Sequence, residues 1–133
     1  MLLKLIHQGL IVKDQKYADM LKNTKFYFIP IINADGFNLV EEHWNSEHEI
    51  INKRKNMNPS NGGTCKDEDS GVDLNRNYGV DWQKGEFSHY EEVCGDFWPG
   101  SEPFSEPESR ALRDFVHAHT SDIKFVINCH TSG

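Results

Sequence analysis

Two short segments of this sequence bring arginine and asparagine side chains together, and these residue types suit the binding of an anion. One segment is Lys53–Asn56 and the other is Gly71–Tyr78, in which Asn75 directly precedes Arg76. The planar guanidinium group of an arginine can hold a carboxylate through two parallel hydrogen bonds, and a neighbouring amide can donate to the same anion. We therefore predict that Asn75 and Arg76 bind a substrate carboxylate. The alternative interpretation of Lys53–Lys55, taken alone, is a solvated basic turn.

Apolar periodicity predicts the first elements that would position these side chains. Between residues 2 and 21 apolar residues recur at three- and four-residue spacing, and Asp14 interrupts the pattern as an N-cap, which predicts one or two amphipathic helices. Residues 26–32 are aromatic and β-branched, which predicts a buried strand. Asn33–Gly36 follows that run and predicts a turn, because these residue types favour turns.

The middle of the chain shows no sustained period. Residues 37–104 carry much of the glycine, proline, asparagine and serine, and a connection of this length is uncommon unless it serves a function. Order returns where Ser105 and Glu108 form the sequence pattern of a capping box, with Pro107 in the first helical turn. We expect a helix near 105–119 and a long functional loop region before it.

A second apolar run closes the chain. Residues 123–130 are nearly continuously apolar and end in His130, which predicts a strand covered on both faces. Together with the strand at 26–32 and the helices near 2–21 and 105–119, this order predicts an α/β fold with a mixed sheet. Functional groups in such folds collect beyond the carboxyl ends of the strands.

Composition excludes several classes of partner. The 14 basic and 21 acidic residues give a formal net charge of −7, which repels nucleic acid and anionic lipid. No apolar run approaches the roughly 20 residues that a membrane-spanning helix requires. The 3 cysteines are too few for a disulfide scaffold and contain no C-x-x-C pair. We therefore expect neither a nucleic-acid partner nor a membrane span.

The order of five motifs resembles that of the zinc metallocarboxypeptidases of the carboxypeptidase A/B type. The Asp-Leu-Asn-Arg-Asn sequence is the most specific of them. The motifs are Pro30-x-x-Asn33-x-Asp35-Gly36-Phe37, Arg54-Lys55, Gly71-Val72-Asp73-Leu74-Asn75-Arg76-Asn77-Tyr78, Pro103-Phe104-Ser105-Glu106-Pro107-Glu108 and a strand that ends in His130. The resemblance implies an α/β/α sandwich, here incomplete.

The resemblance also implies a role for four residues. His130 is similar to the third zinc ligand of the family, and Arg54 to the cation that polarises the scissile carbonyl. Asn75 and Arg76 are similar to the clamp on the free C-terminal carboxylate of a peptide or protein substrate. The implied reaction is hydrolysis of the C-terminal peptide bond, with one zinc ion as cofactor.

Two parts of the family pattern are absent from this sequence. The family's first two zinc ligands come from a His-x-x-Glu motif upstream of the first strand, and its general-base glutamate follows the strand that ends in His130. His89-Tyr90-Glu91-Glu92 has the spacing of the motif but lies on the wrong side of the Asn-Arg segment, so we expect no metal there. We expect residues 1–133 to be part of a catalytic domain and inactive alone. The alternative is a non-catalytic pseudoenzyme, or a module that binds C-terminal carboxylates.

Cys65 and Cys94 match, relative to the surrounding motifs, the positions of a disulfide in some extracellular members of the family. The resemblance therefore implies this disulfide and a secreted protein or one of the secretory pathway, with a signal segment outside this chain. The residue preferred at the substrate's C-terminus is not predicted, because the pocket that selects it is formed mostly by residues past Gly133 in the family.

Overall fold

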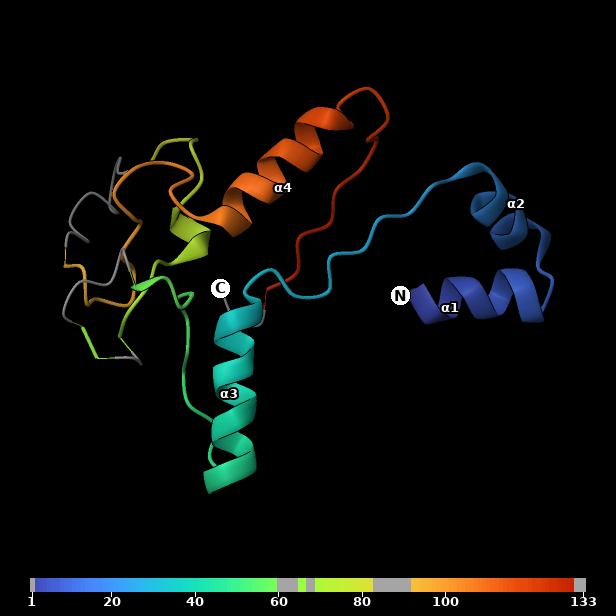
Figure 1. Cartoon of the computed structure of the whole chain (residues 1–133). Coiled ribbons are helices and arrows are strands. Elements are labelled where there is room, and N and C mark those ends of the chain that lie inside the picture. Colours follow the sequence, from blue (N-terminus) through green and yellow to red (C-terminus); the bar gives the residue numbers. More distant parts are fainter. Residues whose placement is uncertain (1, 60–64, 67–68, 83–91, 131–133) are drawn as a thin grey trace. The chain divides into compact units, whose positions relative to one another are not determined.

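A computed structural model of the chain describes residues 2–59, 65–66, 69–82 and 92–130 (Figure 1). The chain forms two compact units, Met1–Pro30 and Ile31–Gly133. Among the described residues, each helix is too short or too polar to cross a membrane.

The first unit is helical, as predicted for residues 2–21. It contains α1 (Leu2–Ile6), a π-helical turn (His7–Ile11) and α2 (Gln15–Asn23). Asp14 is the N-cap of α2, because its carboxylate accepts a hydrogen bond of 3.0 Å from the Lys16 backbone N–H. The prediction that Asp14 begins a second helix is therefore confirmed.

The second unit begins with a helix where a turn was predicted. α3 spans Ala34–Glu47, and the Asn33 side chain caps it by accepting from the Gly36 backbone N–H at 3.0 Å. The amide of Asn33 also donates to the Lys55 carbonyl oxygen at 3.0 Å. The turn prediction for Asn33–Gly36 is wrong because an asparagine that favours turns also favours N-caps. The apolar residues that continue at helical spacing are Phe37, Val40 and Trp44.

The helix predicted near 105–119 is confirmed as α4 (Pro107–Ala118). Its N-cap is Glu106 rather than Ser105, so the predicted capping box does not form. The Ser105 hydroxyl donates instead to the Glu106 carboxylate at 2.7 Å. Asn56 donates to the same carboxylate at 2.7 Å, and these contacts within the unit set where the helix begins.

Neither predicted strand forms. Residues 26–32 and 123–130 contain no strand, and the part of the chain that the structure describes contains no sheet. The predicted α/β/α sandwich with a mixed sheet is therefore wrong for these residues. An apolar run favours an extended backbone, but a strand exists only where a second segment lies alongside to exchange backbone hydrogen bonds.

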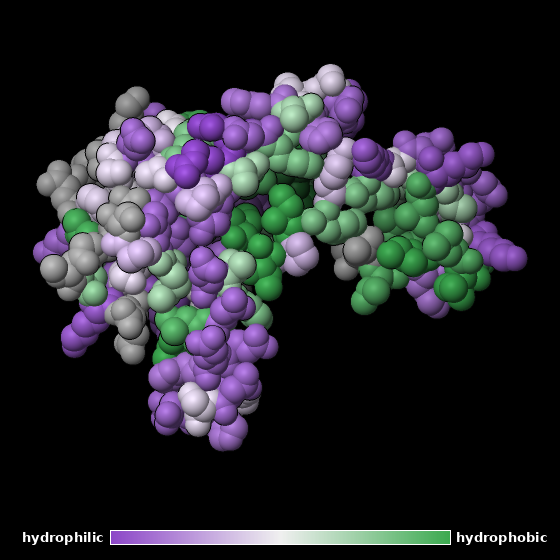
Figure 2. Space-filling model, in the orientation of Figure 1, coloured by the Kyte–Doolittle hydropathy of each residue, from purple (hydrophilic) through white to green (hydrophobic). Residues whose placement is uncertain are grey.

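The two runs instead leave apolar side chains at the surface. Phe28 is 54% exposed and Phe125 is 81% exposed, which is far from the burial that a sheet interior gives. Figure 2 shows apolar residues, coloured green, on the surface of the molecule. The two apolar segments were therefore identified correctly, but the described residues supply no neighbouring strand to pair with them.

The centre of the second unit is mostly polar. Val72 and Leu74 are its buried apolar residues among those described. The buried polar residues are Lys55, Asn56, Asp73, Asn77, Glu106 and Ser109. Because buried polar groups must be hydrogen-bonded, this unit is held by a network of hydrogen bonds from side chains to the backbone and to other side chains.

Gly71 allows two segments of this network to meet. Its φ is +90°, and an added Cβ would lie 1.9 Å from the Asn56 carbonyl oxygen. Any other residue would therefore clash with the backbone. The Asn56 side chain accepts from the Val72 backbone N–H at 2.8 Å, so Gly71 lets the Arg54 segment pack directly against the Asn75 segment.

Candidate functional site

An ion pair joins the two segments that the sequence singled out. The Nε of Arg54 donates to the Asp73 carboxylate at 2.7 Å. The Asp73 side chain is only 3% exposed, whereas that of Arg54 is 32% exposed. A nearly buried carboxylate therefore holds a guanidinium group that still reaches the surface.

The same carboxylate positions the Asn75–Arg76 pair. Its other oxygen accepts from the Asn75 backbone N–H at 3.0 Å, which caps a 3₁₀ helix, η3 (Leu74–Arg76). The Asp73 backbone N–H in turn donates to the Trp98 carbonyl oxygen at 2.8 Å. Asp73 thus connects Arg54, the start of η3 and the segment that follows Cys94. Asn75 is exposed and Arg76 is half-buried.

Phe97 brings the two arginines together. The guanidinium carbon of Arg54 lies 4.8 Å from the centre of the Phe97 ring, and that of Arg76 lies 5.7 Å from it. Both distances are within the range of an attractive cation–π interaction. The two cations therefore converge on one ring in a chain whose formal net charge is −7. Two guanidinium groups and a nearby exposed amide suit a carboxylate and a carbonyl oxygen.

Asn77 supports this arrangement from within the unit. Its side-chain amide donates to the carbonyl oxygens of Pro99 and Glu102 at 2.8 and 3.2 Å, and to the Ser105 hydroxyl at 2.8 Å. Its carbonyl oxygen accepts from the Ser109 hydroxyl and from the Glu106 backbone N–H. Nothing in the sequence around Asn77 predicts this role. The sequence shows that Asn77 lies two residues after Asn75, but it does not show that Asn77 is buried.

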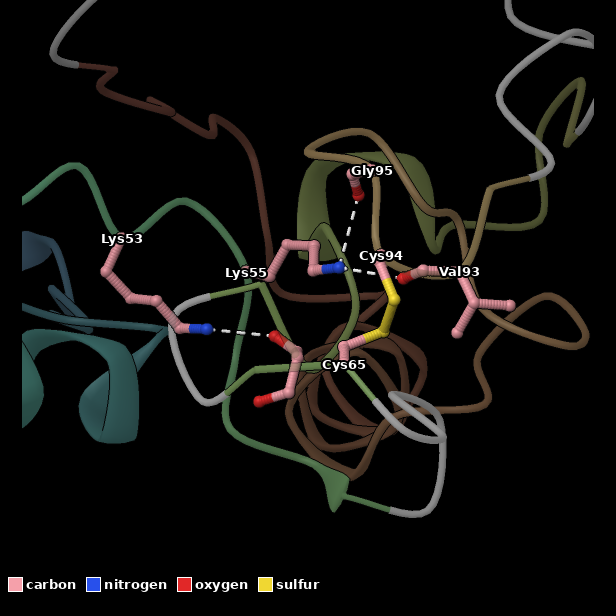
Figure 3. The surroundings of a disulfide bond; sticks show 7 residues. Lys53, Lys55, Cys65, Val93, Cys94 and Gly95 are labelled. Carbon is pink, nitrogen blue, oxygen red and sulfur yellow. Dashed lines mark hydrogen bonds between the residues drawn. A yellow bond between two sulfur atoms is a disulfide. The ribbon is translucent and has the colours of Figure 1, made fainter.

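A disulfide joins Cys65 to Cys94, with their Cα atoms 5.4 Å apart (Figure 3). Beside it the ammonium group of Lys55 donates to the carbonyl oxygens of Val93 and Gly95 at 2.9 and 3.1 Å. Burial lowers the pKa of Lys55 below its ordinary value of 10.5, and repulsion from Lys53 lowers it further. The disulfide and Lys55 together hold the residues on either side of Cys94, three positions before Phe97.

His130 takes no part in these contacts among the described residues. It is exposed at the end of the 123–130 segment, and among the described residues no hydrogen bond, ion pair or ring contact joins it to Arg54, Asn75 or Arg76. The described residues also hold no group of three His, Cys, Asp or Glu side chains placed to bind a metal ion. A catalytic zinc site needs three protein ligands, so these residues do not by themselves fit the metal. In the His-x-x-Glu sequence at 89–92, His89 lies outside the described residues, and Glu92 is exposed.

We predict that Asp73→Asn lowers the free energy of unfolding by about 2 kcal/mol, because a charged hydrogen bond of a nearly buried carboxylate is lost. Urea denaturation would measure this loss. The matched control is Asp114→Asn, which removes a similar 2.8 Å contact with Arg113, but from a carboxylate that is 64% exposed. The Arg113 hydrogen bond lowers the pKa of Asp114, yet water screens such a pair, so the control should be unchanged within error. Equal losses in the two variants would contradict the role given to Asp73.

Comparison with known proteins supplies the family. The model of the zinc carboxypeptidase family matches residues 1–133. Carboxypeptidase O of Homo sapiens is 33% identical over 115 residues, which cover 86% of this chain and 27% of that protein. Mast cell carboxypeptidase A of Homo sapiens is 30% identical over 119 residues, 90% of this chain and 26% of that protein.

Carboxypeptidase B of Astacus astacus is 33% identical over 115 residues, 86% of this chain and 34% of that protein. The chain thus spans about a quarter to a third of the length of these relatives. Because the match to the family extends over the full 133 residues, and because these relatives are similar over most of the chain, the chain belongs to the zinc carboxypeptidase family.

Proposed function

We propose that this chain supplies the substrate-binding part of a zinc metallocarboxypeptidase, which hydrolyses the C-terminal amino acid from peptides and proteins. The observation that carries the proposal is the convergence of Arg54 and Arg76 on Phe97, with Asp73 contacting both Arg54 and the Asn75 backbone. Family membership supports the same class of reaction.

Arg76 and Asn75 bind the terminal carboxylate of the substrate in this proposal. The guanidinium group donates two hydrogen bonds to the planar carboxylate, and the exposed Asn75 amide adds a third donor. Only the end of a chain presents a carboxylate at this place, so the clamp would select C-terminal residues. An internal peptide bond offers no anion to bind.

Arg54 acts on the last peptide carbonyl. Asp73 accepts from the Nε of Arg54, which leaves the two terminal nitrogen atoms of the guanidinium group to donate to the carbonyl oxygen. These donors stabilise the negative charge that develops on that oxygen when a nucleophile attacks the carbon. A preorganised donor of this kind typically contributes about 2.7–4 kcal/mol to transition-state stabilisation.

We propose His130 as one zinc ligand of the active enzyme, on the strength of the family resemblance. The other ligands and the general base would come from residues outside those that the structure describes. An active enzyme needs the other zinc ligands and the general base as well as His130. We therefore propose that the 133-residue chain binds a peptide terminus without cleaving it.

The test is a comparison of two peptides that differ only at the C-terminus. Isothermal titration should give a dissociation constant about 10- to 100-fold lower for the free acid than for the amide, because charged hydrogen bonds contribute about 1.5–3 kcal/mol. Equal affinity for the two peptides would refute the carboxylate clamp.

A hydrolysis assay with added zinc tests the proposed inactivity. The chain should release no C-terminal amino acid above background. Turnover that a chelator abolishes would contradict this and would show that the chain contains a complete metal site. A non-catalytic carboxylate-binding protein would differ from the proposed enzyme in lacking the His-x-x-Glu ligands or the base glutamate, which sequencing the transcript on both sides of this chain would reveal.

We propose an extracellular or secretory-pathway location from the Cys65–Cys94 disulfide. Disulfides persist in oxidising compartments and are rare in the cytosol. Labelling of the protein with a thiol reagent, directly after rapid lysis, should modify Cys129 alone. Labelling of all three cysteines would contradict the proposed location.

A further inference from the structure

Phe97 is an aromatic residue with cations from two different segments on one ring. Arg54 precedes the disulfide loop and Arg76 belongs to η3, yet both guanidinium carbons lie within 6 Å of the ring centre. Phe97 is half-buried, so part of its ring is withdrawn from water, which strengthens its attraction to a cation. None of the motifs in the sequence points to this residue.

The contacts around Phe97 explain why it can hold two cations. Two like charges brought together repel each other, and the Asp73 carboxylate offsets this by accepting from Arg54 at 2.7 Å. Asp73 contacts the Nε edge of the Arg54 guanidinium group, which leaves the planar face of that group for the Phe97 ring. The ring therefore fixes the plane of the guanidinium group, and the carboxylate fixes its direction.

The Phe97 backbone is itself held on both sides. The next residue, Trp98, accepts the Asp73 backbone N–H at 2.8 Å through its carbonyl oxygen. Two residues before Phe97, the Gly95 carbonyl oxygen accepts from Lys55, next to Cys94 of the disulfide. A ring anchored in this way can set the position of mobile side chains instead of following them.

We propose that Phe97 is a positioning residue that holds Arg54 and Arg76 at a fixed separation, so that one substrate terminus meets both. The effect on substrate binding rests on the proposed function. The carboxylate and the adjacent carbonyl of a terminal residue are a fixed distance apart, so a fixed separation of the two arginines suits both groups. A long arginine side chain loses substantial rotamer entropy when it is ordered. Because stacking on Phe97 already orders the two arginine side chains, part of this entropy is lost before the substrate arrives. Substrate binding is therefore stronger.

The first readout needs no substrate. In the NMR spectrum of the 133-residue chain, the Nε–H protons of Arg54 and Arg76 should be displaced from their ordinary position by the ring current of Phe97. Arg54→Lys and Arg76→Lys assign the two signals. In Phe97→Leu both signals should move because the ring current is lost, although the Arg54 signal stays displaced by its hydrogen bond to Asp73. In Phe37→Leu, a change of an exposed phenylalanine in α3, neither should move.

The second readout is peptide affinity. Phe97→Leu should raise the dissociation constant of the free-acid peptide about three- to tenfold, the range that a cation–π contact typically contributes. The constant for the amidated peptide should stay the same, and Phe97→Tyr, which keeps the aromatic face, should stay within about twofold of the original. If the role of Phe97 were purely structural, Phe97→Leu would weaken the binding of both peptides equally.

The outcomes separate this proposal from the proposed function. A signal of either arginine that does not move in Phe97→Leu would overturn the proposal, as would moved signals with unchanged free-acid affinity in that variant. If the unmodified chain binds both peptides equally, the carboxylate clamp fails. The movement of both signals in Phe97→Leu then decides by itself whether Phe97 positions the arginines.

Discussion

Asn77→Ala is expected to lower the free energy of unfolding by about 3–5 kcal/mol, among the largest losses that a single substitution causes. The Asn77 side chain is fully buried and takes part in five hydrogen bonds, and its partners Glu106 and Ser109 are also fully buried. Alanine would remove the acceptor of the buried Glu106 backbone N–H and the amide that donates to the Pro99 and Glu102 carbonyl oxygens, and each buried group left unsatisfied costs about 1–3 kcal/mol.

The matched control is Asn75→Ala, two residues away in the same motif. Asn75 is exposed, so its truncation should change the free energy of unfolding by less than about 0.5 kcal/mol. Urea denaturation of the two variants in parallel would measure both effects. If Asn77→Ala were as stable as Asn75→Ala, the network assigned to Asn77 would not be what holds the second unit together. Asn75→Ala should instead weaken binding of the free-acid peptide.

Removal of the Cys65–Cys94 disulfide should be nearly as costly. The two cysteines are 29 positions apart, and the chain-entropy model gives about 3.6 kcal/mol for a loop of this length. A Cys65→Ser, Cys94→Ser double variant should therefore unfold at a markedly lower urea concentration. Because Lys55 and the disulfide hold the residues before Phe97, the loss should also weaken binding of the free-acid peptide.

Cys129→Ser is the control for the disulfide variant. Cys129 is an exposed cysteine without a disulfide partner, so its replacement should leave the urea midpoint unchanged. A loss below about 1 kcal/mol in the double variant would mean that the loop is already constrained by Lys55 and its two carbonyl partners. A reducing agent should shift the midpoint of the original chain and leave that of the double variant in place.

The sequence predicted helices better than any other part of the fold. α2 and α4 have clear apolar periodicity and recognisable first residues, Asp14 and Pro107, and local signals of this kind act within a few positions. α3 was missed because Asn33 was interpreted as a turn residue. The strands were wrong because pairing depends on a second segment, and an apolar run does not specify which segment that is.

The candidate site was predicted in part. The residue types of Arg54, Asn75 and Arg76 suggested anion binding, and the family resemblance supplied their roles. Phe97 and Asn77 were missed for a physical reason. A phenylalanine in a loop, or an asparagine beside a charged residue, has no local pattern that distinguishes a supporting role, because that role depends on contacts with residues distant in sequence, as between Phe97 and Arg54.

Arg76 is proposed above to bind the carboxylate of a peptide terminus. A double-mutant cycle tests it most directly, by combining Arg76→Gln with the change from free acid to amide in the peptide. Arg113→Gln is the matched control, since Arg113 also stacks on a phenylalanine, Phe104, at 5.0 Å.

We expect a coupling energy of about 1.5–3 kcal/mol between Arg76 and the peptide carboxylate, and none for Arg113. A coupling energy near zero for Arg76, in a variant that still folds and still binds the amidated peptide, would contradict this proposal.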